Sequence, residues 1–118
     1  VLTITNSQIL NNRSTGDAGA LYISAEGKIE NTIIQNNVSA SGNGGGIYTI
    51  GNVSLVNSRL IGNSAVNGGG FFIDPGSAGD AGSATITGTT IANNTAISNG
   101  GGVANTGQLT VSGTTLSN

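Results

Sequence analysis

Few residues of this chain are able to do chemistry. Its 118 residues include five acidic residues, three basic residues, and neither histidine nor cysteine. Ser-His and Cys-His nucleophile pairs and thiolate metal sites are therefore excluded. The chemistry that remains is that of carboxylates, which come from Asp17, Glu26, Glu30, Asp74 and Asp80.

These carboxylates are not placed for catalysis in the repeat described below. Hydrolysis of a glycosidic bond usually needs two carboxylates that face each other across the substrate. Asp17 and Asp74 are expected to lie two coils apart, and Asp80 in a surface loop. Glu26 and Glu30 flank a turn near a lysine, which is typical of a solvated surface turn. We therefore predict no catalytic residues.

Metal binding is not predicted either. The segment 76–80, Gly-Ser-Ala-Gly-Asp, resembles a fragment of the calcium-binding nonapeptide of another solenoid type. It occurs once, whereas such a site needs stacked copies. The prediction is thus that the chain has neither a metal site nor a cofactor.

Among the expected surface features, a row of aromatic residues is the one that most suggests a binding function. Tyr22, Tyr48 and Phe72 each follow an apolar residue of one repeating strand. We expect them to point outward and to stack, with Ala104 ending the row. Such an aromatic strip could bind sugar rings or a partner surface. The alternative interpretation is that stacked aromatic rings only stabilise the face of the sheet.

The elements that position these residues follow from a repeat of roughly 25 residues. Flanking residues alternate in polarity around three apolar columns, as expected of half-buried strands. The columns are Ile4, Ile29, Leu55, Ile86 and Val111; Ile9, Ile34, Leu60, Ile91 and Leu116; and Leu21, Ile47, Phe71 and Val103. We therefore predict an all-β, right-handed parallel β-helix (β-solenoid) of about four and a half coils, with three short strands per coil.

The predicted solenoid is a single domain over residues 1–118. Its coils are expected at about 2–26, 27–52, 53–83 and 84–108, with a partial coil at 109–118. The third coil is longer than the others because of an insertion rich in Gly, Ser and Ala. We predict that this stretch, 74–83, is a protruding loop.

Asparagine and glycine recur at fixed places in the coil. Residues that tolerate a left-handed backbone occupy one predicted turn position, namely Asn6, Asn31, Asn57, Gly88 and Gly113. A second column is predicted to form a ladder of stacked amides, and it contains Asn12, Asn37, Asn63 and Asn94. Glycine triplets at 44–46, 68–70 and 100–102 open the third strand, and 16–19 is interpreted as a degenerate first copy.

These motifs resemble the repeats of the polymorphic outer-membrane protein family, whose signatures are Gly-Gly-Ala-apolar and aromatic-x-x-Asn. The first signature corresponds to 44–47, 68–71 and 100–103, and the second to 9–12, 34–37, 60–63 and 91–94. This chain has Gly where the family favours Ala, and Ile or Leu where it favours Phe. The resemblance implies the β-helix of a secreted, autotransported adhesin.

The leading functional hypothesis is a non-enzymatic structural or adhesive module of a cell-surface or extracellular protein. The alternative is a carbohydrate-binding or polysaccharide-degrading β-helix. With a net charge of −2, the chain lacks the basic surface that nucleic acid requires. No apolar run is long enough to enter a membrane. The expected partners are further copies stacked end to end or flanking coils of a longer chain, and glycans or the surface of a host or neighbouring cell.

Overall fold

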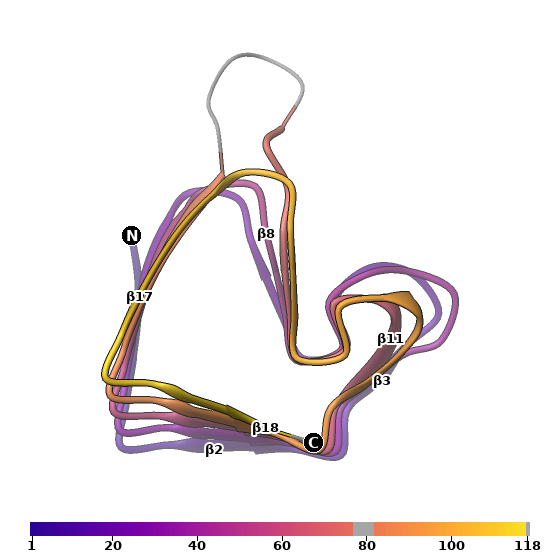
Figure 1. The fold of residues 1–118 in the computed structure, drawn as a ribbon, viewed down its shortest axis with the longest axis horizontal. Coiled ribbons are helices and arrows are strands. Elements are labelled where there is room, and N and C mark those ends of the chain that lie inside the picture. Colours follow the sequence, from indigo (N-terminus) through magenta and orange to yellow (C-terminus); the bar gives the residue numbers. More distant parts are fainter. Residues whose placement is uncertain (77–81, 118) are drawn as a thin grey trace.

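The computed structural model describes residues 1–76 and 82–117. The chain is an all-β solenoid in which each strand pairs in parallel with its counterparts in neighbouring coils. Figure 1 looks along the stack, and the chain circles counter-clockwise as it advances from the faint N-terminal coil towards the viewer. The helix is therefore right-handed, as predicted.

Four parallel sheets run along the solenoid, and we call them sheets A to D. Sheet A contains β1 (Leu2–Thr5), β5 (Glu26–Glu30), β9 (Asn52–Val56), β13 (Ser83–Thr87) and β17 (Gln108–Ser112). Sheet B contains β2 (Gln8–Leu10), β6 (Ile33–Gln35), β10 (Arg59–Ile61), β14 (Thr90–Ala92) and β18 (Thr115–Ser117).

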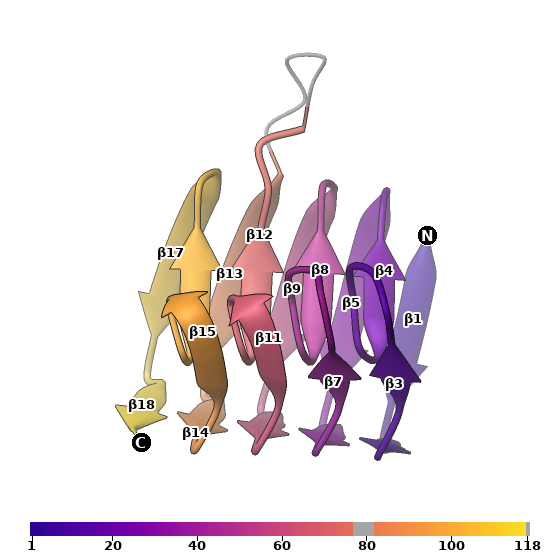
Figure 2. The same cartoon turned by 90° about the vertical axis from the view of Figure 1, so that its right-hand side faces the viewer.

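Sheets C and D have one strand fewer in the described residues. Sheet C contains β3 (Arg13–Ser14), β7 (Val38–Ser39), β11 (Ser64–Asn67) and β15 (Thr95–Asn99). Sheet D contains β4 (Leu21–Ile23), β8 (Ile47–Thr49), β12 (Phe71–Ile73) and β16 (Val103–Asn105). Figure 2 shows the strands of each sheet side by side along the axis.

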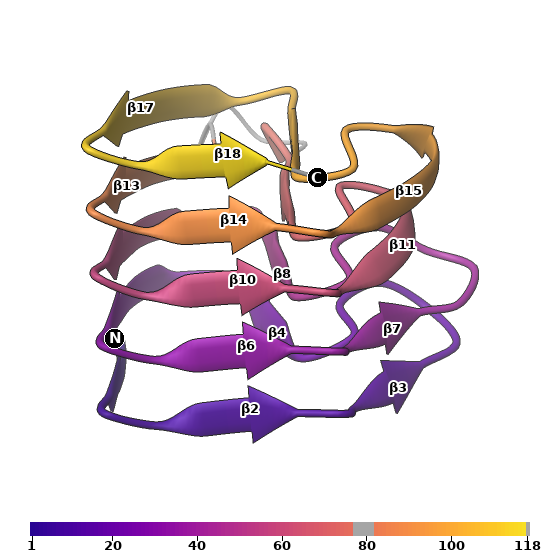
Figure 3. The same ribbon diagram turned by 60° about the horizontal axis from the view of Figure 1, so that its bottom comes forward.

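The prediction of three strands per coil is wrong, because sheet C adds a fourth strand. Its strands are short and mostly polar, as in Arg13–Ser14 paired with Val38–Ser39. Backbone groups make the ladder of a sheet, so such a strand needs no apolar column to form. Figures 1 and 3 show that sheet C leaves the outline formed by the other three sheets and returns to it as a lobe.

The core lies between sheets A, B and D, where the predicted apolar columns meet. Ile29 pairs with Leu55 and Leu55 with Ile86 in sheet A, and all three side chains are inaccessible to solvent. The core cluster also contains the corresponding residues of sheets B and D, namely Ile34, Leu60, Ile91, Ile47, Phe71, Ile23 and Ile73. The three predicted columns are thus confirmed as layers of one core, except that Val111 and Leu116 in the last coil are exposed.

The glycine triplets lie where the lobe rejoins sheet D. A Cβ atom on Gly69 would lie 2.3 Å from the carbonyl oxygen of Thr95, so only glycine allows the backbones to approach this closely. The first copy is out of the predicted register. Leu21 pairs with Ile47, which aligns 18–20, rather than 16–19, with the triplet 44–46.

The insertion follows β12. Asp74, Pro75 and Gly76 have no regular secondary structure, and β13 begins at Ser83. The predicted protruding loop at 74–83 falls largely on residues 77–81, which lie outside the described residues.

Candidate functional site

The aromatic strip forms one continuous stack on the outer face of sheet D. Tyr22 pairs in register with Tyr48, and Tyr48 with Phe72. The ring centroids of the two tyrosines are 5.0 Å apart with an interplanar angle of 23°, and those of Tyr48 and Phe72 are 5.5 Å apart at 3°. The rings therefore face one another along the solenoid axis, and the free ring faces are those at the two ends of the stack.

Tyr48 is the most constrained member of the stack. Only 7% of its surface is exposed, compared with 54% for Tyr22. Its hydroxyl donates a hydrogen bond of 2.5 Å to Oδ2 of Asp74, and Oδ1 of the same carboxylate accepts from the backbone N–H of Gly76. Burial raises the pKa of the Tyr48 phenol well above its ordinary value, and the hydrogen bond to Asp74 and the charges of Asp74 and Asp17 raise it further. The base of the insertion is thus fastened to the aromatic stack.

A second column of amide side chains accompanies the aromatic stack. Asn67 Nδ2 donates to Asn43 Oδ1 at 2.8 Å, and Asn99 Nδ2 donates to Asn67 Oδ1 at 3.0 Å. In the first coil the place is taken by Asp17, whose carboxylate accepts from the backbone N–H of Asn43 at 2.7 Å. We did not predict this column. The signal in the sequence is a polar residue directly before each glycine triplet, or before Ala18 in the first coil.

A hollow of about 370 Å³ opens where the aromatic stack and the amide column end together. Its lining residues come from β12 and β16, from the ends of β11 and β15, and from the positions that flank β16. Its lining combines one aromatic ring, small apolar residues and polar side chains, and consists of Asn67, Phe72, Asn99, Gly100, Val103, Ala104, Asn105 and Thr106. This is the candidate functional site.

The predicted asparagine ladder lies at the corner between sheets B and C. Asn37, Asn63 and Asn94 are buried, and Asn12 is exposed in the first coil. Each buried amide bridges coils. Asn63 Oδ1 accepts from both the backbone and side-chain N–H of Asn37, while its Nδ2 donates to Asn94 Oδ1 and to the carbonyl of Ile34. These contacts are structural, and in Asn37 and Asn63 both the side-chain oxygen and the side-chain nitrogen bond to neighbouring coils.

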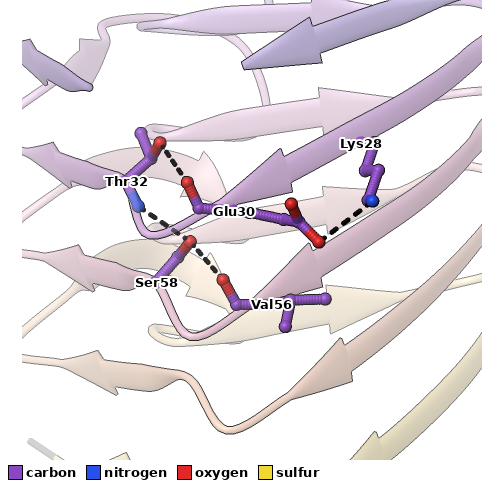
Figure 4. Close-up of polar contacts among 5 residues, drawn as sticks. All are labelled: Lys28, Glu30, Thr32, Val56 and Ser58. Carbon is purple, nitrogen blue, oxygen red and sulfur yellow. Dashed lines mark hydrogen bonds and ion pairs between the residues drawn. The ribbon is translucent and has the colours of Figure 1, made fainter. Parts of the chain in front are cut away.

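A hydroxyl ladder lies at the corner between sheets A and B. The predicted turn residues there have φ between 47° and 58°. Directly after each of them stands a hydroxyl residue that donates to the carbonyl two residues earlier; the set is Ser7, Thr32, Ser58, Thr89 and Thr114. From the second coil onward, the hydroxyl oxygen also accepts from the backbone N–H of the equivalent residue in the coil before. Figure 4 shows two residues of this ladder, in which Thr32 N–H donates to Ser58 Oγ at 3.1 Å. This ladder was missed, although an Asn or Gly followed by Ser or Thr recurs in every coil.

An ion pair lies on sheet A, where Glu26 and Glu30 both belong to strand β5 and do not flank the predicted turn. Lys28 Nζ lies 3.0 Å from Glu30 Oε1 on sheet A, as Figure 4 shows, and both side chains are partly exposed. Within the described residues, no three residues of the His, Cys, Asp and Glu types gather into a group that could hold a metal ion. The same part of the chain contains no helix that could span a membrane.

Comparison with known proteins identifies one segment of the chain. Residues 31–50 match the model of the Chlamydia polymorphic membrane protein repeat. The matched segment begins at the turn residue Asn31 and contains the ladder residue Asn37, the glycine triplet 44–46 and Tyr48 on β8. This match confirms the resemblance drawn from the motifs, over that segment. No curated protein and no solved structure matches the chain.

Proposed function

We propose that this chain is a structural and adhesive β-solenoid module of an extracellular or cell-surface protein. The observation that carries the proposal is the polymorphic membrane protein repeat at residues 31–50. Polymorphic membrane proteins take their name from a membrane location, which favours the cell surface. Adhesion suits a repeated, rigid surface that displays side chains in register from coil to coil.

The interior of the molecule supports a rigid scaffold. Within the described residues, no buried side-chain nitrogen or oxygen lacks a hydrogen-bond partner. The amide and hydroxyl ladders satisfy the polar groups at two corners of each coil, and the apolar columns fill the space between the sheets. Fully paired polar groups of this kind rigidify a fold.

The use of the carboxylates supports a non-enzymatic role. Asp17 is bound by the backbone of the next coil, Asp74 by Tyr48 and Gly76, and Glu30 by Lys28. Each of these three groups therefore has a structural partner, while Glu26 is exposed on β5 and Asp80 lies outside the described residues. Hydrolysis of a polysaccharide would instead require a carboxylate pair open to a substrate.

Bead retention tests the adhesive role. Beads coated with the purified 118-residue chain and beads coated with albumin would be passed over a monolayer of epithelial cells under flow. We expect the solenoid-coated beads to be retained at higher shear, because the repeated surface offers many equivalent contacts. Equal retention of the two bead types would refute the adhesive role and leave a purely structural one.

A further inference from the structure

The aromatic stack ends abruptly at β16. The residue in register with Phe72 on that strand is Ala104. One face of the Phe72 ring is covered by Tyr48, since the two rings are parallel within 3°. The opposite face is turned towards β16, where a methyl group stands in place of a further ring. The hollow of about 370 Å³ lies at this point, with Phe72 and Ala104 in its lining.

Two side chains at the rim of the hollow have polar atoms that make no hydrogen bond within the described residues. Asn99 Nδ2 donates to Asn67, but within residues 1–76 and 82–117 no group donates to Asn99 Oδ1. Asn105 Oδ1 accepts from the backbone N–H of Gly107 at 3.0 Å, while its Nδ2 makes no hydrogen bond to the described residues. An acceptor and a donor are thus available beside the ring. Both side chains are exposed.

None of the residues lining the hollow is ionisable. A charged ligand would gain no ion pair here, and it would lose part of its hydration. The lining therefore favours an uncharged ligand that has an apolar face for the ring and hydrogen-bonding groups at its edge. This is the pattern of many ligand sites, in which a mainly apolar surface is combined with a few convergent polar groups.

We propose that this hollow binds one sugar ring of a neutral glycan. The C–H face of the sugar lies on the free face of Phe72, and its hydroxyl groups donate to Asn99 Oδ1 and accept from Asn105 Nδ2. The inference rests on the proposed adhesive function and names the chemical class that the surface recognises. An aromatic side chain of a partner protein would cover the ring equally well, but it would leave the amide groups at the rim without partners.

Ala104→Tyr is the sharpest test. A Cβ on Gly100 would lie 2.8 Å from the Cβ of Ala104, the same distance that separates the equivalent position on Gly44 from the Cβ of Tyr48. The backbone at β16 thus resembles the one that already carries a tyrosine in the second coil. The new ring is expected to extend the stack and to fill the hollow without disturbing the fold.

Titration calorimetry of the full 118-residue chain with neutral oligosaccharides would measure binding. The probes are cello-, malto- and N-acetylchito-oligosaccharides, with sialylated and sulfated glycans for comparison. We expect one neutral series to bind, Ala104→Tyr to weaken binding at least about tenfold, and Phe72→Ser to do the same. Thr85→Tyr, which adds the same side chain to the exposed face of β13, is the matched control and should bind as the parent chain does.

Three results would overturn the proposal. They are the absence of binding by every neutral probe, preferential binding of charged glycans, and unchanged affinity in Ala104→Tyr when its circular dichroism shows an intact fold. If beads coated with the chain are retained on cells while no neutral glycan binds, the adhesive function stands and the sugar site is refuted. Loss of retention in Ala104→Tyr without glycan binding would point to a protein partner and would also refute the sugar site.

Discussion

Replacing Asn63 by leucine removes the central rung of the buried asparagine ladder. The side chain is inaccessible to solvent and makes hydrogen bonds with both neighbouring coils. Leucine is similar in shape but has no polar atoms. The substitution therefore leaves the backbone N–H of Asn37, one of its side-chain N–H groups and the carbonyl of Ile34 without the partner that Asn63 supplied.

The expected loss of stability follows from the two N–H donors. A buried donor left without a partner costs about 1–3 kcal/mol, so the pair costs about 2–6 kcal/mol. The added apolar side chain offsets part of this cost. We expect the free energy of unfolding to fall by about 3 kcal/mol, which for a chain of this length corresponds to a decrease in melting temperature of about 12 °C.

Urea and thermal unfolding followed by circular dichroism would measure the effect. Asn12→Leu is the matched control, because it makes the same substitution in the same ladder at an exposed position, where water can replace the lost partner. We expect the control to lose less than about 1 kcal/mol. If Asn63→Leu is no less stable than Asn12→Leu, the ladder does not stabilise the stack and the reasoning is wrong.

Four further outcomes are expected. Ala18 has a φ of 61° at the place where later coils have glycine, so Ala18→Gly should raise the free energy of unfolding by about 0.5–1 kcal/mol; an unchanged or lower urea midpoint would contradict this strain. Because the pKa of Tyr48 is higher in the folded than in the unfolded chain, its stabilising contribution is present below about pH 10 and falls as the pH rises from there towards the folded pKa. Urea midpoints measured from about pH 8 to about pH 11 should therefore fall more steeply in the parent chain than in Tyr48→Phe, and equal slopes would refute the assignment. A Cβ on Gly69 would lie 2.5 Å or less from two carbonyl oxygens, whereas one on Gly16 would contact nothing within 4 Å. Gly69→Ala should thus lose about 3 kcal/mol and Gly16→Ala almost nothing, and similar melting temperatures would contradict the close approach. Finally, the outermost strands of the described sheets have unpaired edges, so the 118-residue chain should self-associate on concentration when followed by light scattering; a well-folded monomer at high concentration would exclude end-to-end stacking.

The repeat in the sequence predicted the core well, because the identity of a buried residue is constrained by its neighbours above and below. Ile29, Leu55 and Ile86 could be aligned from their spacing alone, and the structure pairs them in that register. The asparagine column was found for the same reason. A buried amide must be satisfied by the equivalent amide of the next coil, so its type repeats with the coil.

Features made by the backbone were harder to predict. Sheet C depends on main-chain hydrogen bonds, and a strand such as Arg13–Ser14 has no side-chain pattern that marks it. The triplet in the first coil was placed two residues early, because glycines at Gly16 and Gly19 suggested a register that the backbone pairing does not follow. Composition identifies glycine, but it does not identify which glycine makes the close approach.

The candidate site was predicted only in part. Alternation along the strand placed Tyr22, Tyr48 and Phe72 on one face, but it gave no rotamer, and the rotamers decide whether rings present their faces or their edges. The hollow beside Phe72 also depends on the lobe made by sheet C. Asn67 and Asn99 are the last residues of two strands of sheet C. Because that sheet was not predicted, the position of their amide column could not be predicted either.

The direction of the sheet hydrogen bonds has a mechanical consequence. Neighbouring coils are joined by bonds that run along the solenoid axis, so tension applied between the two end coils acts on the bonds of every interface, and the weakest interface separates first. The coils should detach one after another. Each would release roughly 25 residues, or about 85 Å of extended chain. A tether made of such coils would lengthen in steps under load and absorb work at each step, while the coils still stacked keep their full resistance.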